Sequence, residues 1–272
     1  MLMSNLQTEI IRKLGVKPEI DVQSEIRARV DFLKEHVKKA HSAGLLIAIS
    51  GGLDSAVAAA LCKQATDELA QETGQPYETL GVFQPCGEQS DIADSYEVAD
   101  AIQLKYKVET NIEDAVDEIA IEVEYAMKEL GVNKHVSVKG KGNIKARTRM
   151  VYQYALAFER NLLVVGTDHA SEIVTGFFTK YGDGAVDLQP LASLTKRQVK
   201  MLAEALGIPR QVIEKTPTAG LWEGQTDEEE LGLTYDQIND YLEGKEVGEE
   251  ASRKIEKWYM STEHKRAPIP RI

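Results

Sequence analysis

LLIAISGGLDSAVAAALC, residues 45–62, is the stretch that decides the fold. Apolar residues lead into a Ser-Gly-Gly-Leu-Asp-Ser turn at 50–55, and an alanine-rich helical pattern follows directly. This is the pattern of a buried strand that enters a helix through a tight turn. The N–H groups of such a turn and the dipole of the following helix attract anions. The sequence therefore predicts phosphate binding where this strand ends.

The side chains of the turn suit the same chemistry. Gly51 and Gly52 allow the backbone to approach phosphate oxygens closely, and Ser50 and Ser55 add hydroxyl donors. Asp54 is the informative residue, because a carboxylate repels phosphate unless a divalent cation lies between them. We therefore expect Mg²⁺ at Asp54.

A structural interpretation of the turn stays open at this stage. The glycines can form a turn without a ligand, and Asp54 or Ser55 can cap the helix. Two other phosphate motifs do not fit: Gly51 and Gly52 are adjacent, no lysine follows them as in a P-loop, and the spacing of a dinucleotide fingerprint is missing.

Strand and helix patterns alternate along the next part of the chain. Apolar runs predict strands at 45–49, 79–83, 106–109 and 162–165. Helical patterns begin near residues 54 and 91 and cover about 112–130 and 143–158, the last one after a Gly-Lys loop, VKGKGN, at 138–143. This alternation predicts an α/β fold, a Rossmann-like, doubly wound parallel sheet with helices on both faces.

The chain of 272 residues is long enough for one large domain. We expect a single domain over 1–272, with N-terminal helices at 1–43 and an α/β core at 44–210. A mobile loop and a C-terminal helical segment are expected at 211–272, since EKTPTAGLWEGQTDEEELG has the composition of a long loop.

Composition and charge exclude several classes of function. A formal net charge of −12 argues against nucleic-acid binding, which requires a basic face. The sequence shows no apolar run long enough to cross a membrane and no leader, so we expect a cytoplasmic protein without a membrane partner. Cys62 and Cys86 lack metal-ligand spacing and are expected to be reduced thiols, with Cys62 in the core.

The motifs resemble one family. SGGLDS resembles the pyrophosphate-binding loop of the ATP pyrophosphatases, which split ATP into AMP and pyrophosphate. The segments KARTRMVYQYALA at 145–157, VVGTDHASEIVTGFFTKYGDGAVDLQPLASLTKRQV at 164–199, KTPTAGL at 215–221 and HKRAPIP at 264–270 resemble ammonia-dependent NAD synthetase, in order and over nearly the whole chain.

This resemblance implies a fold and an activity. The fold is that of the adenine nucleotide alpha hydrolases. The activity is a ligase reaction, the last step of NAD biosynthesis, in which ATP and ammonia convert deamido-NAD to NAD, AMP and pyrophosphate through an acyl-adenylate. Glutamine-dependent relatives carry an additional amidotransferase domain, for which we expect no room here, so free ammonia or a separate partner is implied.

The resemblance also implies the roles of individual residues. The residues expected to bind ATP are Ser50, Gly51, Gly52, Leu53, Asp54, Ser55, Thr167, Lys196 and Thr218. Those expected to bind deamido-NAD are Arg147, Lys180, Asp187, His264 and Lys265. Asp54 and Glu172 are the expected metal ligands, and with Lys196 they are the expected catalytic residues.

Structural alternatives remain for several of these positions. Thr167 or Ser171 can cap a helix, and Glu172 can be a first-turn acid that complements the helix dipole. Lys196 and Thr218, taken alone, are ordinary solvated residues.

Two further residues are interpreted conservatively. A single histidine at a helix start is more often structural, so His169 is not assigned as a general base. Arg149 is expected to lie on a different helix face from Arg147, because residues two apart do not face the same way.

The resemblance implies a homodimer with the dinucleotide site near the interface. The amphipathic N-terminal helices are the expected apolar surface for it. Two alternatives to the implied activity stay open, another ATP pyrophosphatase and a nucleotide-sensing module without catalysis.

Overall fold

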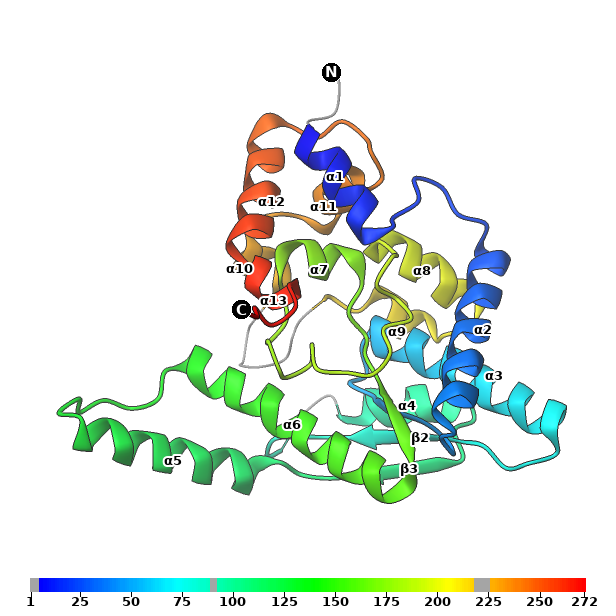
Figure 1. Cartoon of the computed structure of the whole chain (residues 1–272), viewed down its shortest axis with the longest axis horizontal. Coiled ribbons are helices and arrows are strands. Elements are labelled where there is room, and N and C mark those ends of the chain that lie inside the picture. The colour runs from blue at the N-terminus through cyan, green and yellow to red at the C-terminus, as the bar shows by residue number, and fades with distance from the viewer. Residues whose placement is uncertain (1–4, 89–91, 218–225) are drawn as a thin grey trace.

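A parallel sheet forms the centre of the computed structural model, which describes residues 5–88, 92–217 and 226–272 (Figure 1). Its strands are β1 (Gly44–Ala48), β2 (Glu78–Phe83), β3 (Tyr106–Glu109) and β4 (Leu162–Val165), in the spatial order β3-β2-β1-β4. All three neighbouring pairs are parallel. The predicted α/β class and the four predicted strands are confirmed, with bounds that differ by at most one residue.

Both faces of the sheet are covered by helices. Leu45 and Ile47 of β1 are buried in one core, and Leu46 between them is buried in another, because successive strand residues point to opposite faces. The first core receives α3 (Leu53–Thr73) and α4 (Ile92–Ala101), and the second receives α6 (Val138–Arg160), which follows α5 (Glu113–Glu129). The doubly wound arrangement is therefore confirmed.

The direction of winding reverses between β1 and β4. The chain moves outward from β1 to β2 and β3, and then crosses through α5 and α6 to place β4 on the other side of β1. The carboxyl ends of two strands at such a reversal leave a crevice in which ligands bind. The residues that follow β1 and β4 are the turn at 50–55 and Thr167 to Glu172.

The N-terminal helices pack against other helices of the same chain. The helix α2 (Val22–Ala40) buries Ile26, Val30 and Leu33 against α3 and α8 (Lys196–Ala205). The helix α1 (Asn5–Leu14) joins a cluster with α7 (Ala170–Thr175), α10 (Asp227–Leu231), α11 (Tyr235–Leu242) and α12 (Glu249–Ser261). These apolar faces are already covered, which corrects the expectation that they offer a dimer surface.

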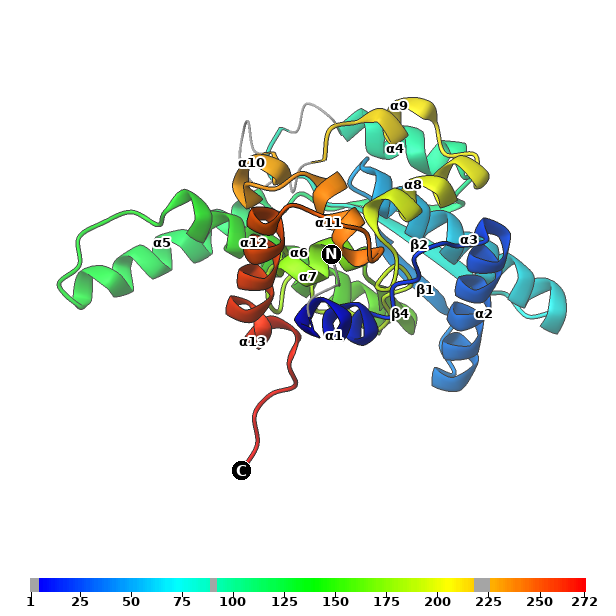
Figure 2. The ribbon, with the colours of Figure 1, turned by 90° about the horizontal axis from the view of Figure 1, so that it is seen from above.

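Exposed apolar side chains gather instead on α5 and α6. These helices extend beyond the body of the molecule as an arm (Figures 1 and 2). The exposed apolar residues on or beside the arm are Ile119, Ile121, Val123, Tyr125, Leu130, Val132, Val138, Val151 and Phe158. Among the described residues, no helix combines the length and apolar character that crossing a membrane requires.

Two expectations about loops are wrong. The VKGKGN stretch is the first part of α6 and not a loop, because Ser137 caps the helix by accepting a hydrogen bond from the Gly140 N–H at 3.1 Å. The stretch after residue 210 contains α9 (Arg210–Glu214) and α10, so it is partly helical, and residues 218–225 lie outside the described part of the chain.

Candidate active site

A cavity of about 1150 Å³ lies at the reversal point of the sheet. Its wall includes the turn after β1, residues 167–168 after β4, the first turn of α8 and the start of α11. The predicted residues Ser50, Gly52, Leu53, Asp54, Ser55, Thr167, Glu172 and Lys196 all line it. The carboxyl ends of β1 and β4 thus open into one cavity.

Hydrogen bonds between its own residues hold the turn before α3. The Ser55 hydroxyl accepts from the Ser50 N–H at 3.2 Å and donates to the Gly52 carbonyl at 3.1 Å. Gly51 has φ +74°, and a Cβ there would lie 2.8 Å from the Asp94 Cβ on α4. Glycine is therefore required at position 51 by the backbone conformation and by the close approach of α4. Gly51 itself does not line the cavity.

Asp54 and Glu172 at the cavity wall converge with His169, which lies beside them, and the three are called the acid–histidine cluster. The His169 Nε2 lies 3.6 Å from Asp54 Oδ1 and 3.5 Å from Glu172 Oε2. His169 is fully buried, and neither its ring nitrogens nor Asp54 Oδ1 has a hydrogen-bond partner among the described residues. Buried polar atoms without partners are costly, so this arrangement indicates a ligand position.

Helix starts bring the charged side chains together. His169 precedes α7, and its backbone N–H donates to the Glu172 carboxylate at 3.4 Å. Glu172 is therefore both a first-turn acid of α7, as the structural alternative expects, and a member of the cluster. Thr195 caps α8 with Gln198 in a capping box, which places Lys196 in the first turn. The Lys196 Nζ donates to Asp54 Oδ2 at 2.6 Å.

Burial sets the protonation preferences of the cluster. Burial raises the pKa of Glu172 well above its usual range, and the Asp54 carboxylate adds to this shift. Burial lowers the pKa of His169 to about 3, so its imidazole is neutral near pH 7. For Asp54, burial opposes ionisation, but the Lys196 ammonium still holds its pKa below the usual value.

Sequence reasoning missed several residues in or next to the cavity. From the sequence His169 is expected to be structural, yet it lies between the two expected metal ligands. Asp168 is buried in the wall, where burial raises its pKa well above the usual range. Its position three residues after a buried strand was a usable signal. Arg149 lines the cavity and donates to the Gln84 carbonyl at 3.0 Å, whereas Arg147 does not line it, so the expected difference in helix face is confirmed.

Four of the five residues expected to bind deamido-NAD form a second group outside the cavity. This outer basic group comprises Arg147, Lys180, His264 and Lys265. The Arg147 guanidinium donates to the Lys180 carbonyl at 3.2 Å, and the Lys180 Nζ donates to the His264 carbonyl at 2.6 Å. The Lys265 Nζ donates to two further carbonyls, of Gly176 and Phe178, at 2.7 Å each.

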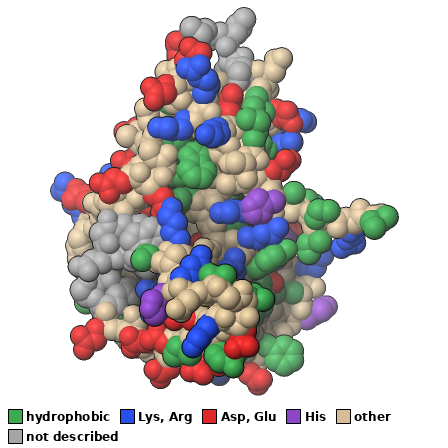
Figure 3. Space-filling view, turned by 90° about the vertical axis from the view of Figure 1, so that its left-hand side faces the viewer, with side chains coloured by type: hydrophobic (Ala, Val, Ile, Leu, Met, Phe, Trp, Pro, Cys, Tyr) green, Lys and Arg blue, Asp and Glu red, His purple; other side chains and the backbone are tan. Residues whose placement is uncertain are grey.

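The outer basic group joins α6, the glycine-rich segment and the short helix α13 (Glu263–Arg266), which are far apart in the sequence. Figure 3 shows Lys and Arg side chains gathered near the middle of the face seen from the side of the arm, with acidic side chains above and below them. A local cationic surface on an acidic protein suits an anionic ligand.

Besides Gly51, two expected residues belong neither to the cavity wall nor to the outer basic group. The Asp187 carboxylate accepts hydrogen bonds from the Tyr154 hydroxyl at 3.2 Å and from the Val164 N–H at 2.8 Å. It thus links α6 to β4, and its predicted substrate contact stays a prediction. Thr218 lies outside the described residues.

Comparison with known proteins decides the family. Residues 25–269 match the family described as NAD synthase. This chain belongs to the NAD synthase family. Over 269 residues it is 47% identical to the NH3-dependent NAD(+) synthetase of Limosilactobacillus fermentum, covering 97% of this chain and 95% of the relative.

Solved structures agree with this family. The NAD+ synthetase of Burkholderia pseudomallei is 35% identical with a TM-score of 0.81, and the match covers 96% of this chain and 95% of that one. An NMN synthetase from Francisella tularensis is 34% identical, also with a TM-score of 0.81, and covers 93% of this chain and 99% of its own. The NAD synthase chain described here thus has the adenine nucleotide alpha hydrolase-like fold expected from its sequence.

Proposed function

We propose that this protein uses ATP to join ammonia to the nicotinate carboxylate of deamido-NAD, giving NAD, AMP and pyrophosphate. It is a carbon–nitrogen ligase of the NAD synthase family. The observation that carries the proposal is the meeting, in one cavity of this family member, of the glycine turn before α3 with Asp54, Glu172 and Lys196. The higher identity to NAD synthetases favours the dinucleotide over the mononucleotide as substrate.

ATP binds in the cavity with its phosphates at the turn before α3. The N–H groups of residues 50–55 and the helix dipole attract the β- and γ-phosphates. The Lys196 ammonium, which lies against Asp54, offsets phosphate charge, and the Thr167 hydroxyl adds a donor. Gly51 and Thr218 complete the set of residues that we assign to ATP.

Mg²⁺ fits the acid–histidine cluster. Asp54 Oδ1 is buried without a hydrogen-bond partner in the described structure, and Glu172 is a buried acid that ionises with difficulty unless a cation is near. Asp54 and Glu172 are the carboxylate ligands of this site. The ion, when bound, supplies charge neutralisation for phosphate oxygens.

The reaction has two steps, and the chain contributes position and charge to both. A carboxylate oxygen of deamido-NAD attacks the α-phosphorus of ATP, and the bond from that phosphorus to pyrophosphate breaks. Ammonia then attacks the carbonyl carbon of the acyl-adenylate, AMP leaves, and the nitrogen loses a proton. Asp54, Glu172 and Lys196 are the catalytic residues, because the charge that develops on phosphate lies against them.

The outer basic group holds the dinucleotide substrate. Arg147 offers a planar guanidinium to a phosphate, and Lys180, His264 and Lys265 surround the same surface, with Asp187 at its edge. The group lies beside α6, and the exposed apolar side chains of α5 and α6 are the surface through which a second copy of this chain binds. A homodimer of this kind places the partner next to the substrate.

The remaining features are assigned accordingly. We infer that the three segments 1–43, 44–210 and 211–272 form one domain, since α1 packs on α7 and α11 while α2 packs on α3. We infer that the protein acts in the cytoplasm, where ATP and free ammonia meet, without a nucleic-acid or membrane partner.

One assay tests the activity. Deamido-NAD, ATP and Mg²⁺ are incubated with ammonium in one tube and glutamine in another, while NAD, AMP and pyrophosphate are quantified. We expect NAD with equal amounts of AMP in the ammonium tube alone. A third tube with nicotinic acid mononucleotide in place of deamido-NAD tests the mononucleotide alternative, and faster AMP formation there would overturn the substrate assignment. ATP binding without AMP formation in any tube would indicate a nucleotide sensor.

A further inference from the structure

Tyr235 is a cavity residue with contacts to two members of the candidate site. Its ring lies beneath the Lys196 ammonium, with 5.3 Å between Nζ and the ring centroid. The same ring meets the His169 ring edge-on, with 5.9 Å between centroids and an interplanar angle of 66°. Its hydroxyl donates to Asp227 Oδ2 at 2.9 Å. One buried side chain of α11 thus touches the residues at 169 and 196, which α7 and α8 supply.

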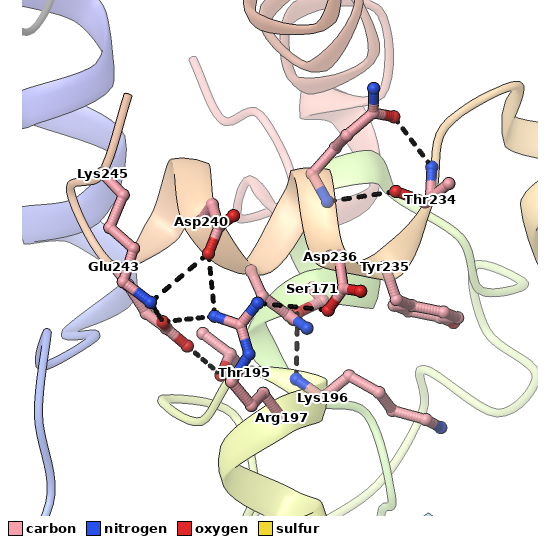
Figure 4. Close-up of polar contacts among 12 residues, drawn as sticks. Ser171, Thr195, Lys196, Arg197, Thr234, Tyr235, Asp236, Asp240, Glu243 and Lys245 are labelled. Atoms are coloured by element: carbon pink, nitrogen blue, oxygen red, sulfur yellow. Dashed lines mark hydrogen bonds and ion pairs between the residues drawn. The ribbon is translucent and has the colours of Figure 1, made fainter. Parts of the chain in front are cut away.

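The rest of α11 holds the first turn of α8, as Figure 4 shows. Arg197 forms ion pairs with Asp236, Asp240 and Glu243 at 3.1, 2.9 and 2.6 Å. The Thr195 hydroxyl donates to Glu243 at 2.9 Å. The backbone on both sides of Lys196 is therefore fixed by α11.

The backbone of Lys196 is fixed in addition through α7. Its N–H donates to the Ser171 hydroxyl at 3.1 Å, and that hydroxyl donates to Asn239 Oδ1 at 2.9 Å. In Figure 4 the side chain of Lys196 extends away from the Arg197 ion pairs, to the side on which Tyr235 lies. These contacts fix the origin of the side chain but not its four rotatable bonds.

We propose that Tyr235 is a positioning residue of the ligase reaction, which holds the Lys196 ammonium at Asp54 by the face of its ring. The inference rests on the proposed function of Lys196. A lysine side chain loses considerable rotamer freedom when it is fixed, and an aromatic face attracts an ammonium most strongly where water is excluded. The Lys196 side chain is 12% exposed, so this condition is met.

The ring has an advantage over a second carboxylate at this place. Another acid next to Asp54 and Glu172 would add negative charge where ATP phosphates must bind. A neutral ring fixes the ammonium and leaves its positive charge available to the phosphates. Burial and the nearby Glu172 carboxyl raise the pKa of Tyr235, so the phenol remains neutral.

The test uses the full-length enzyme and steady-state AMP formation. Tyr235→Met removes the ring at similar volume, Tyr235→Phe keeps it, and Lys196→Met removes the ammonium. We expect Tyr235→Met to lower kcat about tenfold or more while KM for deamido-NAD changes little, and Tyr235→Phe to stay within about threefold of wild type. Tyr241→Phe is the matched control, because Tyr241 is also a buried tyrosine of α11 whose hydroxyl donates to a carboxylate, Glu256.

A double-mutant cycle separates positioning from a general structural effect. If Tyr235 acts through Lys196, adding Tyr235→Met to Lys196→Met causes no further loss of kcat. Equal losses in both backgrounds, or full activity of Tyr235→Met, would overturn the proposal. A wild type without AMP formation would instead overturn the proposed function itself, so the two failures are distinguishable.

Fluorination of the ring decides the case even if Tyr235→Met does not fold. Phenylalanine with one, two or three ring fluorines at position 235 keeps the shape of the side chain and progressively weakens the negative potential of the face. We expect kcat to fall with each fluorine by up to about tenfold in total. A kcat that is independent of fluorination would contradict the proposed attraction.

Discussion

In the cavity, Lys196 lies against Asp54 and both side chains are mostly buried, whereas in the outer basic group Arg147 and Lys180 bind backbone carbonyls and keep more contact with solvent. The first pair is a charge balance within the chain. The second is a positive surface, on which the Arg147, Lys180 and Lys265 side chains donate hydrogen bonds to backbone carbonyl oxygens.

This difference separates two ways of preparing a site for an anion. The cavity is organised in advance: its charges face one another, and under the proposed function a triphosphate with a cation would exchange one set of ionic contacts for another. The outer basic group offers donors on a surface that is shaped by α6, the glycine-rich segment and α13. We infer that the affinity of the outer basic group depends more strongly than that of the cavity on the substrate and on the proposed partner subunit.

The largest expected effect is on the cavity. Asp54→Asn removes the carboxylate that faces Lys196 and the proposed metal, and we expect pyrophosphate release to fall by about 10³-fold or more. The melting temperature and the circular dichroism spectrum should resemble those of wild type. Asp67→Asn is the control, since Asp67 lies on the same helix and pairs with Lys63 at the surface. Near-normal turnover of Asp54→Asn would disprove the assignment.

The outer basic group predicts a different kinetic signature. Arg147→Ala should raise KM for deamido-NAD by about tenfold to a hundredfold, because a charged bidentate donor to phosphate is lost, and leave KM for ATP unchanged. Arg160→Ala is the control on the same helix, because Arg160 pairs with Glu78 away from both sites. A rise in KM for ATP alone would contradict the assignment of Arg147 to the dinucleotide substrate.

The proposed interface gives the next effect. Val151 and Phe158 are seven residues apart on one face of α6 and are 59% and 85% exposed. The double change Val151→Glu/Phe158→Glu should yield monomers in sedimentation velocity and raise KM for deamido-NAD about tenfold, because burial of charge opposes association. Met260→Glu, at a 59% exposed apolar site on α12, is the control. A variant that remains dimeric would show that the interface does not involve this face of α6.

Much of the fold around the cavity could be predicted from the sequence, for physical reasons. A strand that is buried on both faces has a continuous apolar run, so β1 and β4 could be recognised locally, and the turn at 50–55 follows from chain continuity. The start of α6 was missed, because its two glycines have low helix propensity and indicated a loop, whereas Ser137 caps the helix.

The rest of the site depends on contacts between distant segments. No local pattern connects Tyr235 with Lys196, since α11 reaches α8 only through the packing of the C-terminal helices. His169 was set aside for the same reason: a histidine at a helix start is common, and its meaning comes from Asp54, more than a hundred residues earlier. Residues that act by burial of charge are therefore the ones that sequence reasoning assigns least well.

A third charged cluster, with no expected ligand, sharpens the comparison. Glu68 on α3 accepts two hydrogen bonds from Arg27 at 2.8 and 2.9 Å and one from Lys34 at 2.8 Å. The Arg27 guanidinium is the main cause that lowers the pKa of Glu68 to about 2. We expect this cluster to contribute to stability alone, so its removal should leave kcat unchanged.

Glu68→Gln therefore gives the smallest expected effect and a clear pH dependence. Because the folded-state pKa of Glu68 lies below its unfolded value of about 4.3, its contribution is complete at higher pH and is lost as the pH falls toward about 2. Solvent screening limits that contribution to about 1 kcal/mol at pH 7. Urea unfolding at several pH values should show the gap between wild type and Glu68→Gln closing below about pH 5. Glu204→Gln, at an exposed site on α8, is the control for loss of a surface acid, and a loss of kcat in Glu68→Gln would mean that the Glu68 cluster affects the cavity.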